Sequence, residues 1–263
     1  MGECRKRNER AGRLGTMIRT EHLAKRYGRL VAVNDLNLDI PQGQFFAFLG
    51  PNGAGKTTTI KLLAGLLKPT SGRAFIGGYD IQLDPVEARK IISYVPDMPF
   101  LYDKLEPMEF MLFIGQLYGM ERNELVRASD ELFDLFGLDE VRAHPIEQLS
   151  LGTRQRLVIA SALLHQPKVI IIDEPMVGFD PRSARVVKNV LKQRSRAGVT
   201  VFLSTHILPL AEELADQVGI LNRGKLIAVG TIDELRELSG EKGELEDTFL
   251  ALTRGEERAV ELP

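Results

Sequence analysis

One short stretch of the chain restricts the fold more than any other, because an apolar run, a glycine-rich turn and a second apolar run follow one another directly. Residues 45–49 (FFAFL) have the continuous apolar character of a buried strand. Residues 50–58 (GPNGAGKTT) fit the pattern G-x-x-x-x-G-K-[ST], which is typical of a phosphate-binding loop. Residues 59–67 carry Ile and Leu at helical spacing. The sequence therefore predicts a strand, a loop and a helix in the order that this pattern requires.

The loop residues have separate physical reasons for their positions. Glycine lets backbone N–H groups curl around phosphate oxygens, and the start of the helix adds partial positive charge. Lys56 is placed to reach the β- and γ-phosphates, and Thr57 to offer its hydroxyl to Mg²⁺. The alternative is a glycine-rich turn with an incidental lysine. The pattern predicts phosphate binding by Gly50, Pro51, Asn52, Gly53, Ala54, Gly55, Lys56, Thr57 and Thr58.

The composition narrows the class of protein. The 263 residues suffice for one or two domains with a buried core, and the net charge of −2 argues against non-specific nucleic-acid binding as the main activity. The only cysteine, Cys4, excludes a disulfide within the chain and fits a reducing compartment. No apolar run approaches the length of about 18 residues that a membrane-spanning helix needs, so we expect a chain that does not span a membrane.

Residues 1–16 stand apart by their charge, since five Arg and Lys residues oppose two Glu residues, a net charge of 5 − 2 = +3. No apolar segment follows them, so they do not resemble a secretory signal. We expect a disordered extension, or an upstream start with Met17 as the alternative first residue. A basic arm that touches anionic lipid is the other interpretation.

Strands and helices alternate along the rest of the chain. Residues 31–40 show the alternation of a half-buried antiparallel strand, whereas 169–172 and 199–203 are continuous apolar runs that suit a parallel sheet buried on both faces. Residues 97–149 form an insert with helical spacing. Further strands are expected at 17–23, 73–76, 91–95, 217–221 and 226–229, and helices at 109–118, 124–136, 154–165, 182–196, 208–214, 231–238 and 244–252.

Two acidic residues follow the apolar run 169–172. A carboxylate at the C-terminal end of a strand beside the phosphate-binding loop is placed to hold Mg²⁺, which is the role that we expect for Asp173. Glu174, one residue further on, can polarise the attacking water as a general base. The alternative is an acidic strand end that caps a turn.

The segment just before this acidic strand end resembles a motif of a known family. Residues 149–157 (LSLGTRQRL), just upstream of the acidic strand end, resemble the signature of ATP-binding cassette (ABC) ATPases. Asp180 in VGFDP resembles the D-loop of that family, and His206 in STH its switch histidine. Tyr27, ahead of the phosphate-binding loop, resembles its adenine-stacking aromatic residue. The resemblance covers about residues 17–253, with the motifs in the order of the family.

The resemblance implies a head-to-tail dimer with two ATP molecules between its subunits. The signature of one subunit would then cap the ATP held by the other, with the Ser150 hydroxyl on the γ-phosphate and Gly152 offering a backbone N–H. An N-cap of an ordinary helix is the structural alternative for Ser150, and both roles can coexist. His206 could equally be a structural residue at a strand end, and Tyr27 could cover an apolar edge.

Three positions depart from the common pattern of the family. Asp97 stands where the family usually has Gln. Its carboxylate can accept a hydrogen bond from Mg²⁺-bound water but cannot donate one while it is ionised. Leu151 and Thr153 stand where the signature often has Gly and Gln. The predicted metal-binding residues are therefore Thr57, Asp97 and Asp173, and the predicted catalytic residues are Lys56, Glu174 and His206.

The start of the helical insert offers a contact surface. In the family this neighbourhood receives a short helix from a membrane subunit, so Phe100 and Tyr102 are candidate contacts, although both could pack in the core of the insert. The segments 102–105, 109–119 and 246–249 resemble ATPase subunits of ABC-2-type exporters.

These features predict an α/β fold: a P-loop NTPase core of mainly parallel sheet, an N-terminal antiparallel β-subdomain and an inserted α-helical subdomain. The resemblance implies a subunit that binds and hydrolyses ATP with Mg²⁺, pairs with a second ATPase subunit and powers an integral membrane permease, an exporter, from the cytoplasmic face. A regulatory ATP-binding subunit of low turnover and a soluble ABC ATPase are the alternatives, and no nucleic-acid partner is expected. The expected boundaries are 1–16 (extension), 17–96 with 156–230 (core), 97–155 (helical subdomain) and 231–263 (C-terminal helices and tail).

Overall fold

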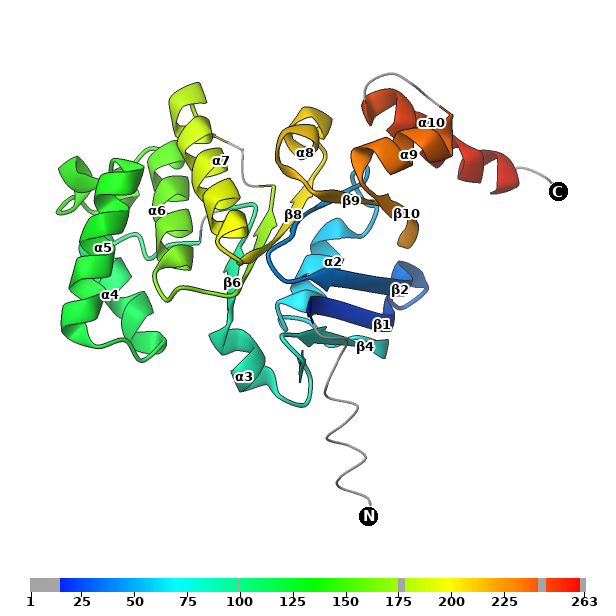
Figure 1. Cartoon of the computed structure of the whole chain (residues 1–263). Coiled ribbons are helices and arrows are strands. Elements are labelled where there is room, and N and C mark those ends of the chain that lie inside the picture. The colour runs from blue at the N-terminus through cyan, green and yellow to red at the C-terminus, as the bar shows by residue number, and fades with distance from the viewer. Residues whose placement is uncertain (1–14, 99, 175–177, 241–244, 261–263) are drawn as a thin grey trace, which may run out of the picture.

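The computed structural model describes residues 15–98, 100–174, 178–240 and 245–260, with only the backbone for 254–260. The extension predicted for residues 1–16 therefore lies almost entirely outside the described residues. Within them the chain forms two sheets flanked by helices (Figure 1). One sheet has the strand order β2-β1-β4-β5 and the other the order β10-β9-β3-β8-β7-β6.

The smaller sheet is the predicted antiparallel subdomain. It is made of β1 (Thr16–Tyr27), β2 (Leu30–Pro41), β4 (Ser71–Ile76) and β5 (Tyr79–Asp80), and all its pairs are antiparallel. In β2, Leu36, Leu38 and Ile40 are buried while Asn37 and Asp39 are exposed. The alternation in the sequence therefore places one face of this sheet on the core.

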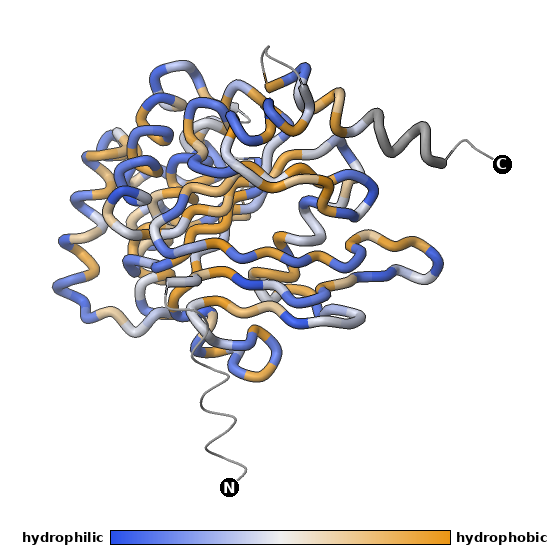
Figure 2. Tube along the Cα trace, turned by 45° about the vertical axis from the view of Figure 1, so that its right-hand side comes forward, coloured by the Kyte–Doolittle hydropathy of each residue, from blue (hydrophilic) through white to orange (hydrophobic). Residues whose placement is uncertain are grey.

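The larger sheet is mainly parallel, as predicted. Only the pair of β9 and β10 is antiparallel, and β3 lies at the centre between β8 and β9. Every residue of β3, β7 and β8 is buried, which explains their continuous apolar runs, orange in Figure 2. The strands are β3 (Phe45–Leu49), β6 (Ile92–Val95), β7 (Val169–Asp173), β8 (Thr200–Thr205), β9 (Gln217–Asn222) and β10 (Lys225–Gly230).

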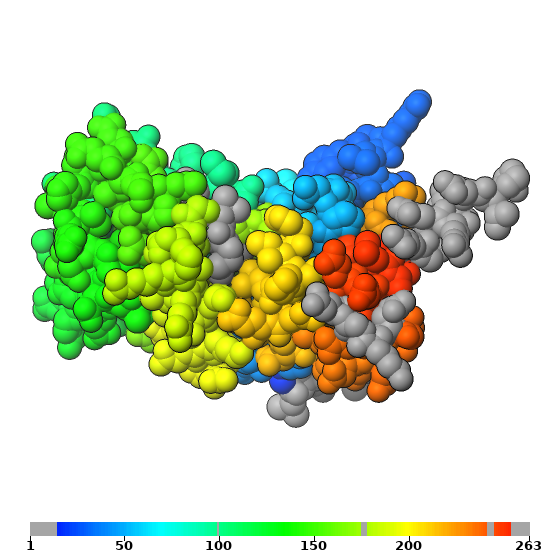
Figure 3. Space-filling model, turned by 90° about the horizontal axis from the view of Figure 1, so that it is seen from above, coloured from blue at the N-terminus to red at the C-terminus, as the bar shows by residue number. Residues whose placement is uncertain are grey.

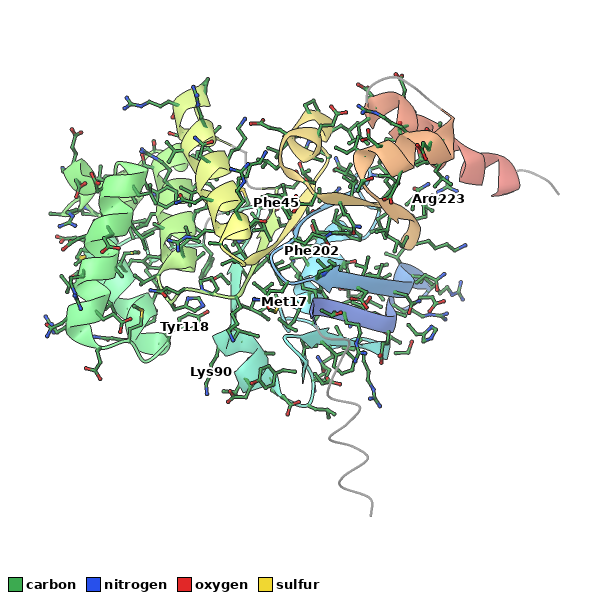
Figure 4. The ribbon with its side chains drawn as sticks, viewed as in Figure 1. Met17, Phe45, Lys90, Tyr118, Phe202 and Arg223 are labelled. Atoms are coloured by element: carbon green, nitrogen blue, oxygen red, sulfur yellow. The ribbon has the colours of Figure 1, made fainter. Side chains whose placement is uncertain are left out.

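Helix α2 (Lys56–Leu63) is packed between the two sheets, where Ile60 joins a cluster with Phe46 and Phe202 of the larger sheet and Ile18 of the smaller one. Figure 4 shows Phe202 and Phe45 in the middle of the molecule, on neighbouring strands. The two faces of the larger sheet therefore take part in separate clusters, since Phe45 belongs to the cluster that the helices on the other face cover.

The remaining helices cover the other face and both ends of the larger sheet. Green helices extend from one end and the orange and red C-terminal helices from the other (Figure 3). Helices α4 to α7 share one cluster with that face, and α8 to α10 pack around β9 and β10. Their bounds are α4 (Pro107–Leu117), α5 (Arg122–Phe136), α6 (Leu151–Leu163), α7 (Pro181–Arg196), α8 (Leu208–Leu214), α9 (Ile232–Ser239) and α10 (Leu245–Val260).

Several expected elements have other bounds in the structure: β1 ends at Tyr27 rather than residue 23, α6 begins at Leu151 rather than residue 154, and α10 ends at Val260 rather than residue 252. Helix α2 begins at Lys56 rather than Thr59 and ends at Leu63 rather than Leu67, because Gly65 adopts φ 68 and the Leu66 N–H turns back to the Lys61 carbonyl. Helix α3 (Pro85–Lys90) and strand β5 were not predicted, and both are short. The expected domain boundaries stay a prediction, and helix α6 runs across the one at 155/156.

Candidate nucleotide-binding site

The phosphate-binding loop joins β3 to α2 and is tightly packed at both ends. A Cβ at Gly50 would lie 2.4 Å from the Leu221 carbonyl oxygen, and one at Gly55 would lie 2.2 Å from that of Ala32. Gly55 also adopts φ 107, a conformation that other residues rarely take. The two outer glycines of the motif are thus required by β9 and β2, and not only by a ligand.

The start of α2 offers unpaired donors toward the loop. Its N-cap is Gly55, no side chain caps it, and its first turn holds no acidic residue. The first N–H groups of a helix have no partner within the helix and carry partial positive charge. Pro51, Asn52 and Gly53 of the loop are exposed, as is Thr57 on the first turn, so this end of the helix is accessible to an anion.

Lys56 bends back over the loop. Its side chain is 7% exposed, and its Nζ donates to the Gly50 carbonyl at 2.7 Å and to the Pro51 carbonyl at 3.3 Å. Burial lowers the pKa of Lys56, and the carboxylates of Glu174 and Asp173 oppose that shift. The ammonium group therefore lies at the mouth of the loop, where phosphate oxygens are expected.

Asp173 ends β7 as a buried carboxylate with no exposed surface. Neither carboxylate oxygen has a hydrogen bond of ordinary geometry within the described residues, although the hydroxyls of Thr57 and Ser204 lie near enough to lower its pKa in part. Burial is the larger effect and raises the pKa of Asp173. A buried carboxylate without partners is costly unless a cation compensates it, so the group fits a Mg²⁺ site that Thr57 also faces.

Glu174 follows in a left-handed conformation with φ 47, which is uncommon for a residue other than glycine and is often found at functional sites. Its N–H donates to the Ser204 carbonyl at 3.0 Å. Its carboxylate Oε1 lies 2.9 Å from His206 Nδ1 and 3.8 Å from Lys56 Nζ. The structure therefore brings together the three predicted catalytic residues, one at the start of α2 and the others directly after β7 and β8.

The predicted signature residues begin α6. Ser150 is its N-cap: its Oγ accepts from the Thr153 N–H at 3.2 Å and lies 2.8 Å from Thr153 Oγ1. A Cβ at Gly152 would lie 2.8 Å from the Gly178 carbonyl oxygen, and one at Gly178 would lie 2.8 Å from the Leu151 side chain. The start of the signature helix is therefore in contact with the segment that leads to α7.

Comparison with known proteins gives the family. Residues 33–177, more than half of the chain, match the ABC transporter family. The chain belongs to this family. It is 36% identical over 237 residues to the linearmycin resistance ATP-binding protein LnrL of Bacillus subtilis, a match that covers 90% of this chain and 75% of LnrL.

Solved structures agree with this assignment. An ATP-binding subunit of an ABC transporter matches with a TM-score of 0.86 and 32% identity, over 90% of this chain and 99% of the other. The dimeric ATP-binding cassette MJ0796, solved in a post-hydrolysis state with ADP and Pi, matches with a TM-score of 0.74 and 28% identity, over 82% of this chain and 98% of the other. The predicted fold and the class of ATP-hydrolysing enzyme are confirmed: the chain is an ABC ATPase.

Asp180, expected in the D-loop of this ABC ATPase, is the N-cap of α7. Its Oδ1 accepts from the N–H groups of Arg182 at 2.9 Å and Ser183 at 3.0 Å. The Ser183 hydroxyl is the main cause that lowers the pKa of Asp180. This capping role was not predicted, although an Asp directly before Pro181 is typical of a helix start.

Asp97 lies just beyond β6 and is exposed. It is close enough to raise the pKa of buried Asp173, and with Asp173 it adds to the burial that raises the pKa of Tyr94 to about 12. The proximity is compatible with a shared metal site, but a metal role for Asp97 stays a prediction.

Phe100 and Tyr102, the two candidate partner contacts at the start of the insert, have different surroundings. Tyr102 packs on α4, with ring centroids 6.5 Å from Phe110 and 5.5 Å from Phe113. Phe100 is 81% exposed. Tyr102 is itself 50% exposed and its ring centroid lies 6.5 Å from that of Phe100, so a partner contact stays a prediction for both residues.

Tyr27 ends β1 and is 47% exposed, with Lys25 Nζ 5.2 Å from its ring centroid. Its ring is accessible for stacking, so both interpretations of Tyr27 stay predictions.

Among the described residues, no helix has both the length and the apolar character that crossing a membrane requires.

One contact in the site was not predicted: Thr205 Oγ1 donates a hydrogen bond to Glu174 Oε2 at 3.3 Å. The only signal in the sequence is that polar residues, Ser204 and Thr205, follow the apolar run at the end of β8.

Proposed function

We propose that this ABC ATPase binds Mg²⁺-ATP on its phosphate-binding loop, hydrolyses it as one half of a head-to-tail pair of ATPase subunits, and drives a separate integral membrane permease that exports its substrate. The observation that carries the proposal is the convergence of Lys56, Glu174 and His206 beside the buried carboxylate of Asp173.

Each side chain of the site has its own role in this proposal. The Lys56 ammonium and the first N–H groups of α2 bind the phosphates and fix their orientation. Asp173 and Thr57 would hold the metal, which when bound would supply charge neutralisation at the phosphates. Glu174 accepts a proton from the attacking water, and His206, whose Nδ1 lies 2.9 Å from the Glu174 carboxylate, contacts the γ-phosphate in this proposal.

The partner ATPase subunit follows from the signature. Ser150 and Gly152 lie at the start of α6 and their neighbours are Thr153 and Gly178, whereas the phosphate-binding loop leads into α2. A second subunit placed head-to-tail would supply its Ser150 hydroxyl and Gly152 N–H to the ATP on this loop. The dimeric state of MJ0796 supports such a pair, either as a homodimer or as a heterodimer.

The permease and the direction of transport are supported by the relatives. LnrL is named for resistance to linearmycin, which is consistent with export of a toxic compound. Exposed Phe100 offers an apolar contact at the start of the insert. We place the chain at the cytoplasmic face of the membrane through this permease, and the net charge of −2 gives no reason to expect a nucleic-acid partner.

The test is phosphate release from Mg²⁺-ATP by the full chain, alone and with the membrane protein that co-purifies with it in mild detergent. Glu174→Gln should abolish turnover and leave ATP binding intact, because it keeps the size of the side chain and removes the base. Equal turnover in the variant would show that Glu174 is not the base.

A second candidate function rests on Asp97, Leu151 and Thr153, which depart from the usual family residues. They favour a regulatory subunit that binds ATP but turns it over slowly, paired with a more active ATPase. Vigorous ATP hydrolysis by a homodimer of this chain would exclude it.

A further inference from the structure

We infer that Thr205 is a positioning residue for Glu174, which it holds in place through its hydroxyl group; the inference rests on the general-base role proposed above. Thr205 is the last residue of β8 and has no exposed surface. Because β8 lies between β3 and β7, its end is beside both the phosphate-binding loop and the acidic strand end.

The Thr205 hydroxyl takes part in two hydrogen bonds with compatible directions. It accepts from the Ile207 N–H at 3.0 Å and donates to Glu174 Oε2 at 3.3 Å. A hydroxyl has one proton and two lone pairs, and an N–H group can only donate, so the proton is free to point at the carboxylate. Hydrogen bonds in catalytic sites are often long before the substrate is bound. Through this hydroxyl group, Thr205 and Ile207, the two residues that flank His206, are both linked to the Glu174 carboxylate.

The two oxygens of the Glu174 carboxylate have different partners. Oε1 faces His206 and Lys56, both of which are proposed to contact phosphate, whereas Oε2 faces Thr205. When Lys56 and His206 engage ATP, their attraction for Oε1 weakens. Thr205 has no proposed phosphate contact, so its bond is the one that persists and fixes the carboxylate toward the attacking water.

The backbone explains why this anchor is needed. Glu174 sits in the strained conformation with φ 47, and its N–H is held by the carbonyl of Ser204, the neighbour of Thr205. Ser204 itself cannot replace Thr205, because it is paired with Asp173 in the sheet and its hydroxyl lies near that carboxylate. The end of β8 thus orients the backbone of Glu174 through one residue and its side chain through the next.

The test is steady-state hydrolysis of Mg²⁺-ATP by the full chain. Thr205→Val has nearly the same shape without the hydroxyl, so kcat should fall about tenfold, as expected for a lost hydrogen bond to a charged group. The KM for ATP should stay within about twofold, because the phosphate contacts are untouched. Thr205→Ser should restore kcat to within about threefold of wild type, since it keeps the donor.

Thr200→Val is the matched control, because it is the same change at the opposite end of the same strand. Thr200 is equally buried, and its hydroxyl accepts from the Gly43 N–H at 3.0 Å and donates to the Pro41 carbonyl at 3.2 Å. This variant should lose stability but keep kcat. Thr205→Ala is measured in the same way, and decides the question if the valine variant does not fold.

Each outcome separates the inference from the proposed function. If wild type hydrolyses ATP and Thr205→Val keeps its kcat, the inference is overturned and the proposed function stands. It is also overturned if Thr205→Ser does not recover kcat, or if KM rises with the loss of kcat, because both results indicate a structural role. Absence of turnover in wild type with its membrane partner contradicts the proposed function first.

Discussion

Lys56 Nζ lies 3.8 Å from Glu174 Oε1, so the lysine of the phosphate-binding loop and the proposed base form a largely buried ion pair. The same ammonium group bonds to two loop carbonyls. A cation in this position serves two functions: it stabilises the charge of Glu174 and it attracts phosphate. Its removal should therefore affect nucleotide binding more strongly than the fold.

Lys56→Met should weaken ATP binding by at least about tenfold, because it removes a charge-assisted contact at a buried position and keeps the length of the side chain. Titration calorimetry with Mg²⁺-ATP measures the change. Lys61→Met, on the exposed side of the same helix, is the control and should bind ATP as wild type does. Equal affinity in the two variants would contradict the assignment of Lys56.

Ser150 allows the capping role and the phosphate role to be separated. Ser150→Ala should lower the free energy of unfolding by about 1 kcal/mol through loss of the N-cap, and should lower turnover as well. Ser150→Asp keeps the cap but places a negative charge where the γ-phosphate is expected, so it should retain stability and lose turnover. Thr231→Ala, at the N-cap of α9, should lose stability only. Normal turnover in Ser150→Asp would show that Ser150 acts only as the N-cap of α6.

Asp173→Asn should stabilise the chain in the absence of nucleotide. Burial raises the pKa of this carboxyl group, so its ionised form is costly near neutral pH, and the amide removes that cost of about 1 kcal/mol. The melting temperature should rise without Mg²⁺-ATP and should no longer respond to it. Asp216→Asn is the control, since Asp216 accepts from the Phe45 N–H at 2.7 Å, and should keep the response. A preserved response in Asp173→Asn would exclude the metal role.

Much of the site could be predicted because its residues lie at the ends of apolar runs. A buried strand followed by Asp173 and Glu174, and another followed by His206, must present their side chains at the same edge of a parallel sheet. The positions of Lys56 and Thr57 followed from the loop pattern in the same way. The fold class was predictable for the same reason, since apolar runs and helical spacing alternate along the chain.

The unpredicted features depend on tertiary contacts. The left-handed backbone of Glu174 is held by a neighbouring strand, and the bond from Thr205 to its carboxylate joins residues 31 positions apart. The steric need for Gly152 arises from the Gly178 carbonyl, which no local pattern reveals. The short helix α3 buries only Ala88, so its apolar signal was too weak to detect.

His165 makes stability depend on pH. Its ring is stacked on Tyr118 at 3.5 Å between centroids, at the junction of α4 with β6 where Figure 4 labels Tyr118. Burial lowers the pKa of His165 from 6.5 to about 4, and a bond to the Ile92 carbonyl opposes the shift. The unfolded chain therefore takes up a proton near pH 6.5 that the folded chain takes up only near pH 4.

The free energy of unfolding should accordingly fall as the pH drops from about 6.5 to about 4, by about 2 kcal/mol after allowance for partial exposure of the ring. Urea unfolding of wild type at several pH values in this window measures the slope. His165→Phe keeps the stack on Tyr118 without a titrating group, and should flatten the slope. His144→Gln, at an exposed position, should keep it. An unchanged slope in His165→Phe would assign the effect to other groups.

Phe100 and Tyr102 test how the chain meets its membrane partner. Phe100→Ala removes a ring that is 81% exposed, so the free energy of unfolding should change by less than about 0.5 kcal/mol and hydrolysis by the chain alone should not change. Recovery of the integral membrane protein that co-purifies with wild type should nevertheless fall, because an exposed aromatic anchor is lost.

Tyr102→Ala should differ from Phe100→Ala in its effect on stability. Its ring packs against Phe110 and Phe113, so the free energy of unfolding should fall by about 1–3 kcal/mol. Urea unfolding and quantitative co-purification in mild detergent, carried out on the same preparations, distinguish the two variants. If Phe100→Ala recovers as much membrane protein as wild type, the permease binds elsewhere on the chain, and the exposure of Phe100 has no part in coupling.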